Sequence, residues 1–342
     1  MYKVAIVGCG RIGCSFDDDP KRKVIFTHAG AYSKVPRTKL QALVDLDQNK
    51  LNTYGRKFNV ANLYTDYRKM LEIEKPDIVS ICTLSDTHLE IAEECVRKGV
   101  RAVFCEKPIA SNVDDARKLV KICRDNHVLL QINHRRRFCE FHQEVKKFLD
   151  RRDLGKIQQV SFYYMAGIAN TGSHMFDLLS FFFGDVDYVQ AFYSNNESLN
   201  ENDPNLDGVV KFKSGLLCTV QAANVADFLL FETDIIGSKG RLKLTRTGLD
   251  FEYYEVGEST IYSEYKELYR TKFPHDVKIT GELMVNSVNH LVECLDTHKD
   301  SVSSGEDGLK SLELINAFME SAKENGERVY LPLKEKMALK TR

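Results

Sequence analysis

The sequence contains no tryptophan, almost no net charge and no long apolar run. Its 342 residues include 48 Lys and Arg against 49 Asp and Glu, which gives a formal net charge of −1. A chain with balanced charges lacks the excess of positive charge that is typical of proteins that bind nucleic acid or an anionic membrane. No apolar stretch approaches the ~18 residues that a membrane-spanning helix needs. We therefore expect no nucleic acid and no membrane among the partners.

Cysteine is present, but its pattern excludes two common uses. The nine cysteines are odd in number and include no Cys-x-x-Cys pair, which argues against a disulfide framework and against a zinc site. Cys82, Cys105 and Cys218 lie in apolar strand-like runs, where a free thiol behaves as a small hydrophobic group. The N-terminus has no charged segment that leads into an apolar stretch with a cleavage site. These features predict a cytoplasmic protein without a bound metal.

The first 133 residues alternate between strand and helix patterns. Apolar runs typical of strands occupy 2–7, 40–44, 77–82, 102–105 and 128–132, and helical patterns between them include 87–98 and 113–126. Strands that alternate with helices of about ten to fifteen residues indicate a parallel sheet wound on both faces. We expect residues 1–133 to form one doubly wound α/β domain.

After roughly residue 137 the pattern changes to consecutive strands. A helix over 140–151, a strand over 157–164 and a helix over 174–183 come first. Strand patterns follow at 186–193, 208–213, 216–223, 229–236 and 241–245, and helices resume at 282–298 and 308–325. Turn residues at 213–215 and 237–240 indicate hairpins. We expect residues 134–330 to form an α+β domain with a large, mostly antiparallel, open-faced sheet, and we leave the tail 331–342 unplaced.

A glycine-rich turn follows the first strand directly. Gly8-Cys9-Gly10-Arg11-Ile12-Gly13 comes immediately after the apolar run 4–7. In a dinucleotide-binding turn, Gly8 permits the tight bend, Gly10 lets the backbone approach the diphosphate, and Gly13 lets helix and strand pack closely. The diphosphate then lies at the positive end of the following helix. A plain tight turn is the alternative, and the position of the motif favours the dinucleotide.

A carboxylate ends the second predicted strand. Asp45 lies 32 residues beyond Gly13, whereas the usual spacing is nearer ~20, so an insertion is predicted around 16–26. At this position a carboxylate accepts the hydroxyls of the adenosine ribose and repels a 2′-phosphate. NAD is therefore favoured over NADP, the alternative being a solvated loop aspartate.

Two further groups of residues could carry chemistry. Glu106-Lys107-Pro108 follows the apolar strand 102–105, and ligands gather at the carboxyl ends of strands in such sheets. His174 opens an apolar helix, with Asp177 three residues later and Asn170 four residues earlier. A histidine there can exchange a proton near neutral pH, and Asp177 can orient its ring. The alternatives are an exposed turn lysine and a histidine that caps the helix or satisfies the core.

These motifs, in this order, resemble the Gfo/Idh/MocA oxidoreductases, the glucose–fructose oxidoreductase and inositol dehydrogenase family. The motifs that carry the resemblance are the glycine turn, Glu106-Lys107-Pro108, Gly172-x-His174-x-x-Asp177, Thr83-Leu84-Ser85-Asp86-Thr87-His88 and Asn133-His134-Arg135-Arg136-Arg137-Phe138. The resemblance implies a Rossmann domain, a second domain with an open-faced sheet, and a homodimer or homotetramer formed through that sheet. It also implies hydride exchange between NAD and a sugar or polyol carbon.

The resemblance assigns roles to particular residues. Lys107 would polarise the reacting oxygen, His174 would act as general acid or base, and Asn170 and Asp177 would support the substrate. The cofactor would be bound by Gly8, Gly10, Arg11, Ile12, Gly13, Asp45, Thr83, His88, Glu106 and Lys107.

Three departures from the family pattern stand out. Asn170 occupies a position where many members have aspartate, and asparagine there resembles the branch that oxidises nucleotide sugars. Leu84 stands where proline is common. The third departure is the insertion, which contains three aspartates at 17–19 and the sequence Lys-Arg-Lys at 21–23. That insertion either lies over the cofactor or is a solvated loop. Arginines 135–137 could meet a phosphate or a carboxylate.

The function we expect is that of an NAD-dependent oxidoreductase acting on a sugar or sugar derivative, nucleotide sugars included. The alternatives are an inositol or polyol dehydrogenase and a dinucleotide sensor without catalytic activity, because fold alone does not settle function.

Overall fold

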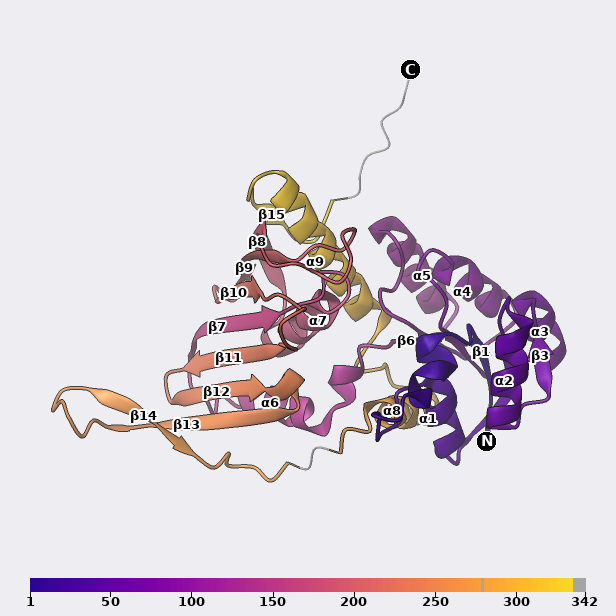
Figure 1. Cartoon of the computed structure of the whole chain (residues 1–342), viewed down its shortest axis with the longest axis horizontal. Helices are drawn as coiled ribbons and strands as arrows, with labels where there is room; N and C mark the ends of the chain where they lie inside the picture. Colours follow the sequence, from indigo (N-terminus) through magenta and orange to yellow (C-terminus); the bar gives the residue numbers. More distant parts are fainter. Residues whose placement is uncertain (278–279, 335–342) are drawn as a thin grey trace, which may run out of the picture. The chain divides into compact units, whose positions relative to one another are not determined.

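The computed structural model describes residues 1–277 and 280–334 (Figure 1). The chain divides into two compact units, and the first combines Met1–Cys139 with Thr280–Leu312. The second begins at Glu140 and resumes at Glu313. This organisation differs from the division at 133/134 expected from the sequence, because a late segment of the chain returns to the first unit. Residues 335–342, part of the tail left unplaced, lie outside the described residues.

The first unit is built on a six-stranded parallel sheet in the order β3-β2-β1-β4-β5-β6. Its strands are β1 (Tyr2–Val7), β2 (Thr38–Val44), β3 (Asn62–Tyr64), β4 (Ile78–Ile81), β5 (Ala102–Cys105) and β6 (Leu129–Ile132). The connecting helices are α1 (His28–Lys34), α2 (Gln48–Phe58), α3 (Tyr67–Glu74), α4 (His88–Arg97) and α5 (Val113–Asp125). The strand order reverses between β1 and β4, which is where ligands bind in sheets of this kind. The predicted doubly wound fold is confirmed.

The returning segment covers one face of this sheet. Helix α8 (Leu283–Thr297) lies beside α1 (Figure 1), and its apolar side chains join the core formed by alternate residues of the strands. Met284, Val288 and Leu291 are buried there together with Ile6 and Phe104. Their burial explains why 280–312 belongs to the first unit.

The helix expected directly after the glycine turn is not a regular one. Residues Arg11–Ser15 form a π-helical turn and Phe16–Asp18 a single 3₁₀ turn, and α1 begins only at His28. The inserted residues are folded back on themselves, since Asp17 accepts hydrogen bonds from the backbone N–H groups of Phe26 (2.7 Å) and Thr27 (3.3 Å). Thr27 in turn caps α1 by accepting from Gly30 N–H. A helical segment does follow the glycine turn, but it consists of these two short, irregular turns and not of a regular α-helix.

The second unit contains a nine-stranded mixed sheet in the order β14-β13-β12-β11-β7-β10-β9-β8-β15. Its strands are β7 (Ile157–Tyr164), β8 (Val186–Tyr193), β9 (Leu206–Phe212), β10 (Leu217–Ala222), β11 (Glu232–Gly237), β12 (Gly240–Thr245), β13 (Asp250–Glu258), β14 (Lys266–Thr271) and β15 (Val329–Tyr330). β7 and β10 run parallel, whereas the other paired neighbours are antiparallel. The predicted large, mostly antiparallel sheet is confirmed.

Helices cover one face of this second sheet. They are α6 (Glu140–Asp150), α7 (Gly172–Phe183) and α9 (Gly305–Lys323), which begins in the first unit and continues in the second. Phe141 of α6 stacks on Phe251 of β13 at 4.6 Å, and Phe176 of α7 meets Phe318 of α9 edge-on at 4.8 Å. Along β11 and β12, buried residues alternate with partly exposed ones, so the two faces of the sheet differ in burial.

Two general expectations can be compared with the described residues. All nine cysteines are buried and have free thiols. None of the helices in the part of the chain that the structure describes combines the length and the apolar character that crossing a bilayer requires.

Candidate active site

The predicted cofactor residues share one edge of the first sheet. The glycine turn follows β1, Asp45 follows β2, Thr83 follows β4, and Glu106 and Lys107 follow β5. Because all six strands are parallel, these segments leave the sheet at the same edge. The topology therefore brings the first-unit residues of the predicted site together.

The three motif glycines are required for different reasons. Gly8 has φ = 101°, and a Cβ there would lie 2.6 Å from the carbonyl oxygen of Cys82. A Cβ on Gly13 would lie 2.1 Å from the carbonyl oxygen of Gly8. Around Gly10, in contrast, a Cβ would meet nothing within 4 Å. The fold demands glycine at two positions, and open space at the third suits the close approach of a diphosphate.

Asp45 is held in place beside the glycine turn. Its carboxylate accepts hydrogen bonds from the backbone N–H groups of Cys9 (2.8 Å) and Asp47 (2.9 Å). Lys50 approaches it to 4.0 Å. The neighbouring Leu46 is 91% exposed and offers an apolar surface to a flat base. This arrangement fits an adenosine whose ribose is bound by the carboxylate.

His88 is buried inside the connection that follows β4. Its Nε2 lies 3.2 Å from the carbonyl oxygen of Thr83, and its Nδ1 lies 3.2 Å from that of Ile109 and 3.3 Å from the Cys105 sulfur. Burial lowers the pKa of His88 below its ordinary value, although the carbonyl contacts oppose this effect. With 1% of its surface exposed, the ring supports the Thr83 segment from within the fold.

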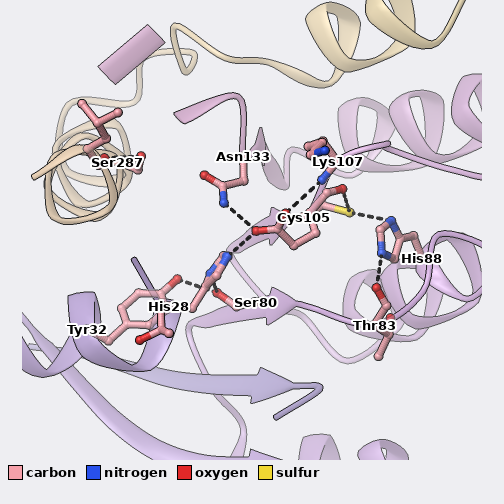
Figure 2. A network of polar contacts seen from close by, with 12 residues as sticks. His28, Tyr32, Ser80, Thr83, His88, Cys105, Lys107, Asn133 and Ser287 are labelled. Atoms are coloured by element: carbon pink, nitrogen blue, oxygen red, sulfur yellow. Dashed lines mark hydrogen bonds and ion pairs between the residues drawn. The ribbon is translucent and has the colours of Figure 1, made fainter. Parts of the chain in front are cut away.

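Glu106 is the centre of a buried polar network, and Figure 2 labels its partners His28, Asn133 and Lys107. One of its oxygens accepts from Asn133 Nδ2 (2.5 Å) and from His28 Nε2 (2.8 Å), and the other lies 3.3 Å from Lys107 N–H. Burial by itself raises the pKa of the Glu106 carboxyl, but His28, Asn133 and the charge of Lys107 outweigh it and hold the pKa below its ordinary value. The network fixes the main chain at Lys107, the residue expected to meet the substrate.

The same network continues beneath the sheet edge. The Ser80 hydroxyl of β4 contacts His28 Nδ1 at 3.0 Å and Tyr32 OH at 2.8 Å (Figure 2). Three strands and α1 are thus joined through polar side chains that are almost completely buried. Asn133 Oδ1 is buried and has no hydrogen-bond partner among the described residues, which leaves one acceptor at the strand ends.

The arginines after β6 have different surroundings. Arg137 is buried and bonds to the carbonyl oxygen of Val302 and to Asp307, both at 2.9 Å. Burial lowers the pKa of Arg136 to about 9, with the charge of Arg135 acting in the same direction. Arg135 is half-buried and lies over the Phe26 ring. Arg137 is therefore a structural residue, a distinction that the sequence alone did not provide.

The remaining predicted site residues belong to the second unit. His174 lies in the first turn of α7, half-buried, and Asp177 lies one turn later, with 1% of its surface exposed. Asn170 precedes the helix, where its backbone N–H donates to Asp203 (2.9 Å) and its carbonyl oxygen accepts from Ser173 (2.7 Å). The three residues predicted from the second half are therefore neighbours at one helix start.

Sequence reasoning missed several members of the network. His28, Tyr32 and Ser80 belong to no short motif with chemical meaning, and they lie 48 to 78 residues along the chain from the groups that they contact. Asn133 belongs to one of the motifs that carry the resemblance, but its bond to Glu106, 27 residues away, was not predicted. The available signal was the position of Asn133 at the carboxyl end of a predicted strand.

Comparison with known proteins gives matches along most of the chain. Residues 2–134 match the Gfo/Idh/MocA oxidoreductase family, NAD-binding Rossmann fold, and residues 168–331 match the C-terminal alpha/beta domain of the same family. The D-apiose dehydrogenase of Paraburkholderia graminis is 27% identical over 94% of this chain and 88% of its own length. The myo-inositol 2-dehydrogenase of Thermotoga maritima is 23% identical over 94% of this chain and 96% of its own.

Solved structures agree with the fold. The WlbA dehydrogenase of Bordetella pertussis, determined with NADH and UDP-GlcNAcA, is 21% identical and has a TM-score of 0.77 over 97% of this chain and 99% of that one. With the glycine turn, the sheet topology and both family matches in agreement, the chain belongs to the Gfo/Idh/MocA oxidoreductases, with an NAD-binding Rossmann domain followed by the C-terminal alpha/beta domain of that family.

Proposed function

We propose that the protein is an NAD-dependent dehydrogenase of a sugar or sugar derivative, with Lys107 and His174 acting on the reacting hydroxyl. The observation that carries this proposal is the position of Lys107 at the carboxyl end of β5, on a turn fixed by the buried Glu106 network. That turn lies at the same sheet edge as the glycine turn.

The proposed chemistry gives Lys107 and His174 separate roles. Lys107 donates a hydrogen bond to the substrate oxygen and stabilises the negative charge that develops there. His174 accepts the hydroxyl proton as the C–H and O–H bonds break and the C=O bond forms. Bound NAD⁺ supplies the acceptor for the hydride. Asp177 and Asn170 support His174 and the substrate, and an amide at position 170 binds by hydrogen bonds without taking a proton.

The substrate class is proposed from the relatives. The two relatives described above are named as dehydrogenases of D-apiose and myo-inositol, and WlbA was determined with UDP-GlcNAcA. A cyclic polyol is therefore the alternative to a sugar. The Asp45 carboxylate supports NAD over NADP, because a 2′-phosphate beside it would be repelled.

Assembly and location are also proposed. Partly exposed apolar side chains on the second sheet, namely Leu217, Val256, Leu268 and Tyr269, support a homodimer or homotetramer formed through that sheet. Nine buried free thiols support a reducing compartment, the cytoplasm.

The test is the absorbance of reduced nicotinamide when the protein meets NAD and a panel of free sugars, polyols and nucleotide sugars. We expect turnover with one class, and we expect His174→Ala and Lys107→Met to lower kcat by about 10²- to 10⁴-fold while NAD still binds. Lys118→Met, which removes an exposed lysine paired with Asp115 on α5, is the matched control and should retain full activity. Absence of turnover with every class would overturn the proposal, and full activity in His174→Ala would overturn the role of that residue.

A further inference from the structure

An alternating row of arginine and phenylalanine lies at the edge of the first sheet. The guanidinium carbon of Arg11 lies 4.6 Å from the centre of the Phe16 ring, and that of Arg22 lies 4.4 Å from Phe16 and 4.6 Å from Phe26. Arg135 lies 5.0 Å from Phe26. We call these five residues the arginine stack. Three of them come from the insertion 16–26, which thereby links the glycine turn to the segment after β6.

The stack gathers three positive charges, with Asp19 as an ion-pair partner of Arg22 and the charge of Glu106 acting on Arg135. Among the described residues, Asp19 is the single carboxylate within ion-pair distance of any of the three guanidinium groups, at 3.5 Å from Arg22. The Arg22 Nε that faces Asp19 is buried and forms no hydrogen bond in the described part of the chain. Burial lowers the pKa of Arg135, the charge of Glu106 opposes this effect, and the charge of Arg22 adds to it. Bringing two partly desolvated cations together is unfavourable unless an anion joins them.

The two ends of the arginine stack lie beside different strands of the first sheet. Arg11 lies in the glycine turn after β1, where the cofactor diphosphate is expected. Arg135 follows β6, three strands away in the order β1-β4-β5-β6, which is about 14 Å at the usual strand spacing. Two residues before Arg135, Asn133 bonds to Glu106, the neighbour of Lys107 (Figure 2). Arg135 therefore lies toward the Lys107 side of the sheet edge, and Arg22 is linked to it through the Phe26 ring.

We propose that Arg22 and Arg135 form an oxyanion site that binds the carboxylate or phosphate of a negatively charged sugar substrate. This proposal rests on the proposed function and specifies its substrate class. A guanidinium group is planar and binds a carboxylate or a phosphate through two parallel N–H groups. The rings of Phe16 and Phe26 hold the Arg22 side chain between them, so less rotamer freedom is lost when the anion binds.

The experiment compares charged and neutral probes on the full-length protein. Calorimetry in the presence of NADH, which prevents turnover, measures the binding of D-glucose, D-glucuronate and D-glucose 6-phosphate. We expect at least one anionic probe to bind the wild type about tenfold more tightly than glucose, which is the 1.4 kcal/mol expected for one charge-assisted contact. Arg22→Gln should remove this preference, and Arg22→Lys, which keeps the charge without the planar fork, should retain part of it.

The control is Lys21→Gln, which removes an exposed cation from the same insertion and should keep the preference for the anion. Thermal unfolding of each variant shows whether the insertion remains folded. A wild type without preference for either anion would overturn the proposal. So would a tenfold loss of NADH affinity in Arg22→Gln with the preference intact, since the stack would then bind the cofactor diphosphate. Failure of the dehydrogenase proposal would instead appear as absent turnover with the binding preference unchanged.

Discussion

The three glycines of the turn after β1 have separate roles at the scale of single residues. Gly8 and Gly13 are dictated by the chain itself, because a side chain at either would collide with a carbonyl oxygen. Gly10 has φ = −74° and ψ = −160°, an extended conformation open to any residue, and faces open space. Its requirement for glycine therefore comes from the ligand.

This difference predicts opposite outcomes for two alanine variants. Gly10→Ala should leave the melting temperature unchanged or slightly higher, since alanine restricts the unfolded chain by about 0.4–1 kcal/mol, while the affinity for NAD falls at least tenfold. Gly13→Ala should lower the melting temperature because its Cβ would lie 2.1 Å from the Gly8 oxygen. Thermal unfolding without ligand and a titration with NAD measure the two effects. Equal loss of stability in both variants would contradict this reading of the glycines.

The stability of the folded protein depends on pH through His88. Its pKa in the folded protein is lowered, chiefly by burial, from the ordinary value of 6.5. The unfolded chain therefore binds a proton at a higher pH than the folded chain does. Stability from this residue is fully present above pH 6.5 and is lost as the pH falls from there toward the lower folded pKa. His134, whose pKa is also lowered by burial, acts in the same direction.

We predict that the free energy of unfolding falls below about pH 6.5, and that His88→Gln makes this fall shallower. One histidine contributes at most about 1.4 kcal/mol per pH unit, and urea unfolding between pH 5.5 and 7.5 can resolve that slope. His127→Asn is the control, because His127 is exposed and has a left-handed backbone (φ = 55°) that asparagine tolerates. An unchanged slope in His88→Gln would exclude His88 as its source.

At the scale of elements, the strands and helices that could be predicted from the sequence are those with a clear hydrophobic pattern. Strands β1, β4 and β5 and helices α4 and α5 were found within one or two residues, because continuous apolar runs and helical patterns reflect burial directly. Strands β3 and β15 have three and two residues, too short for any period to emerge. Hairpin β13–β14 was also missed, since most of β14 is exposed and carries no buried alternation.

The candidate site could be predicted where its residues are neighbours in the sequence, and not where only the fold brings them together. Glu106 and Lys107 were found because a charged turn after an apolar strand is visible in the sequence. The partners of Glu106 were not, because His28 is 78 residues away and only the folded sheet brings the two together. The insertion was located by its length, but its arginine stack depends on side-chain packing that no spacing rule describes.

At the scale of the whole molecule, the first unit depends on a distant part of its own chain. Met284, Val288 and Leu291 of α8 are buried against the sheet. Each contributes about 1.5–3 kcal/mol by leaving water, and a typical domain is stable by only about 5–15 kcal/mol. The free energy gained by burying these side chains of the segment 280–312 is thus comparable to the net stability of the unit.

A fragment of residues 1–139 should therefore aggregate or bind a hydrophobic dye such as ANS. The same fragment joined to 280–312 through a flexible Gly/Ser linker should be soluble, melt cooperatively and bind NAD. Light scattering, dye fluorescence and thermal unfolding compare the two. A shorter fragment that melts at the same temperature as the joined one would show that α8 is dispensable.

Because α8 comes late in the chain, it is synthesised long after the strands that it covers. When Cys139 has been made, the six strands of the first sheet are complete, but Thr297, the last residue of the helix that shields one face, is still 158 residues away. At the usual rates of translation, about 5–20 residues per second, the α8 helix is completed roughly 8–32 s later. During that interval the exposed apolar face of the sheet is a natural substrate for chaperones, and a pause in translation between residues 140 and 280 would lengthen the exposure.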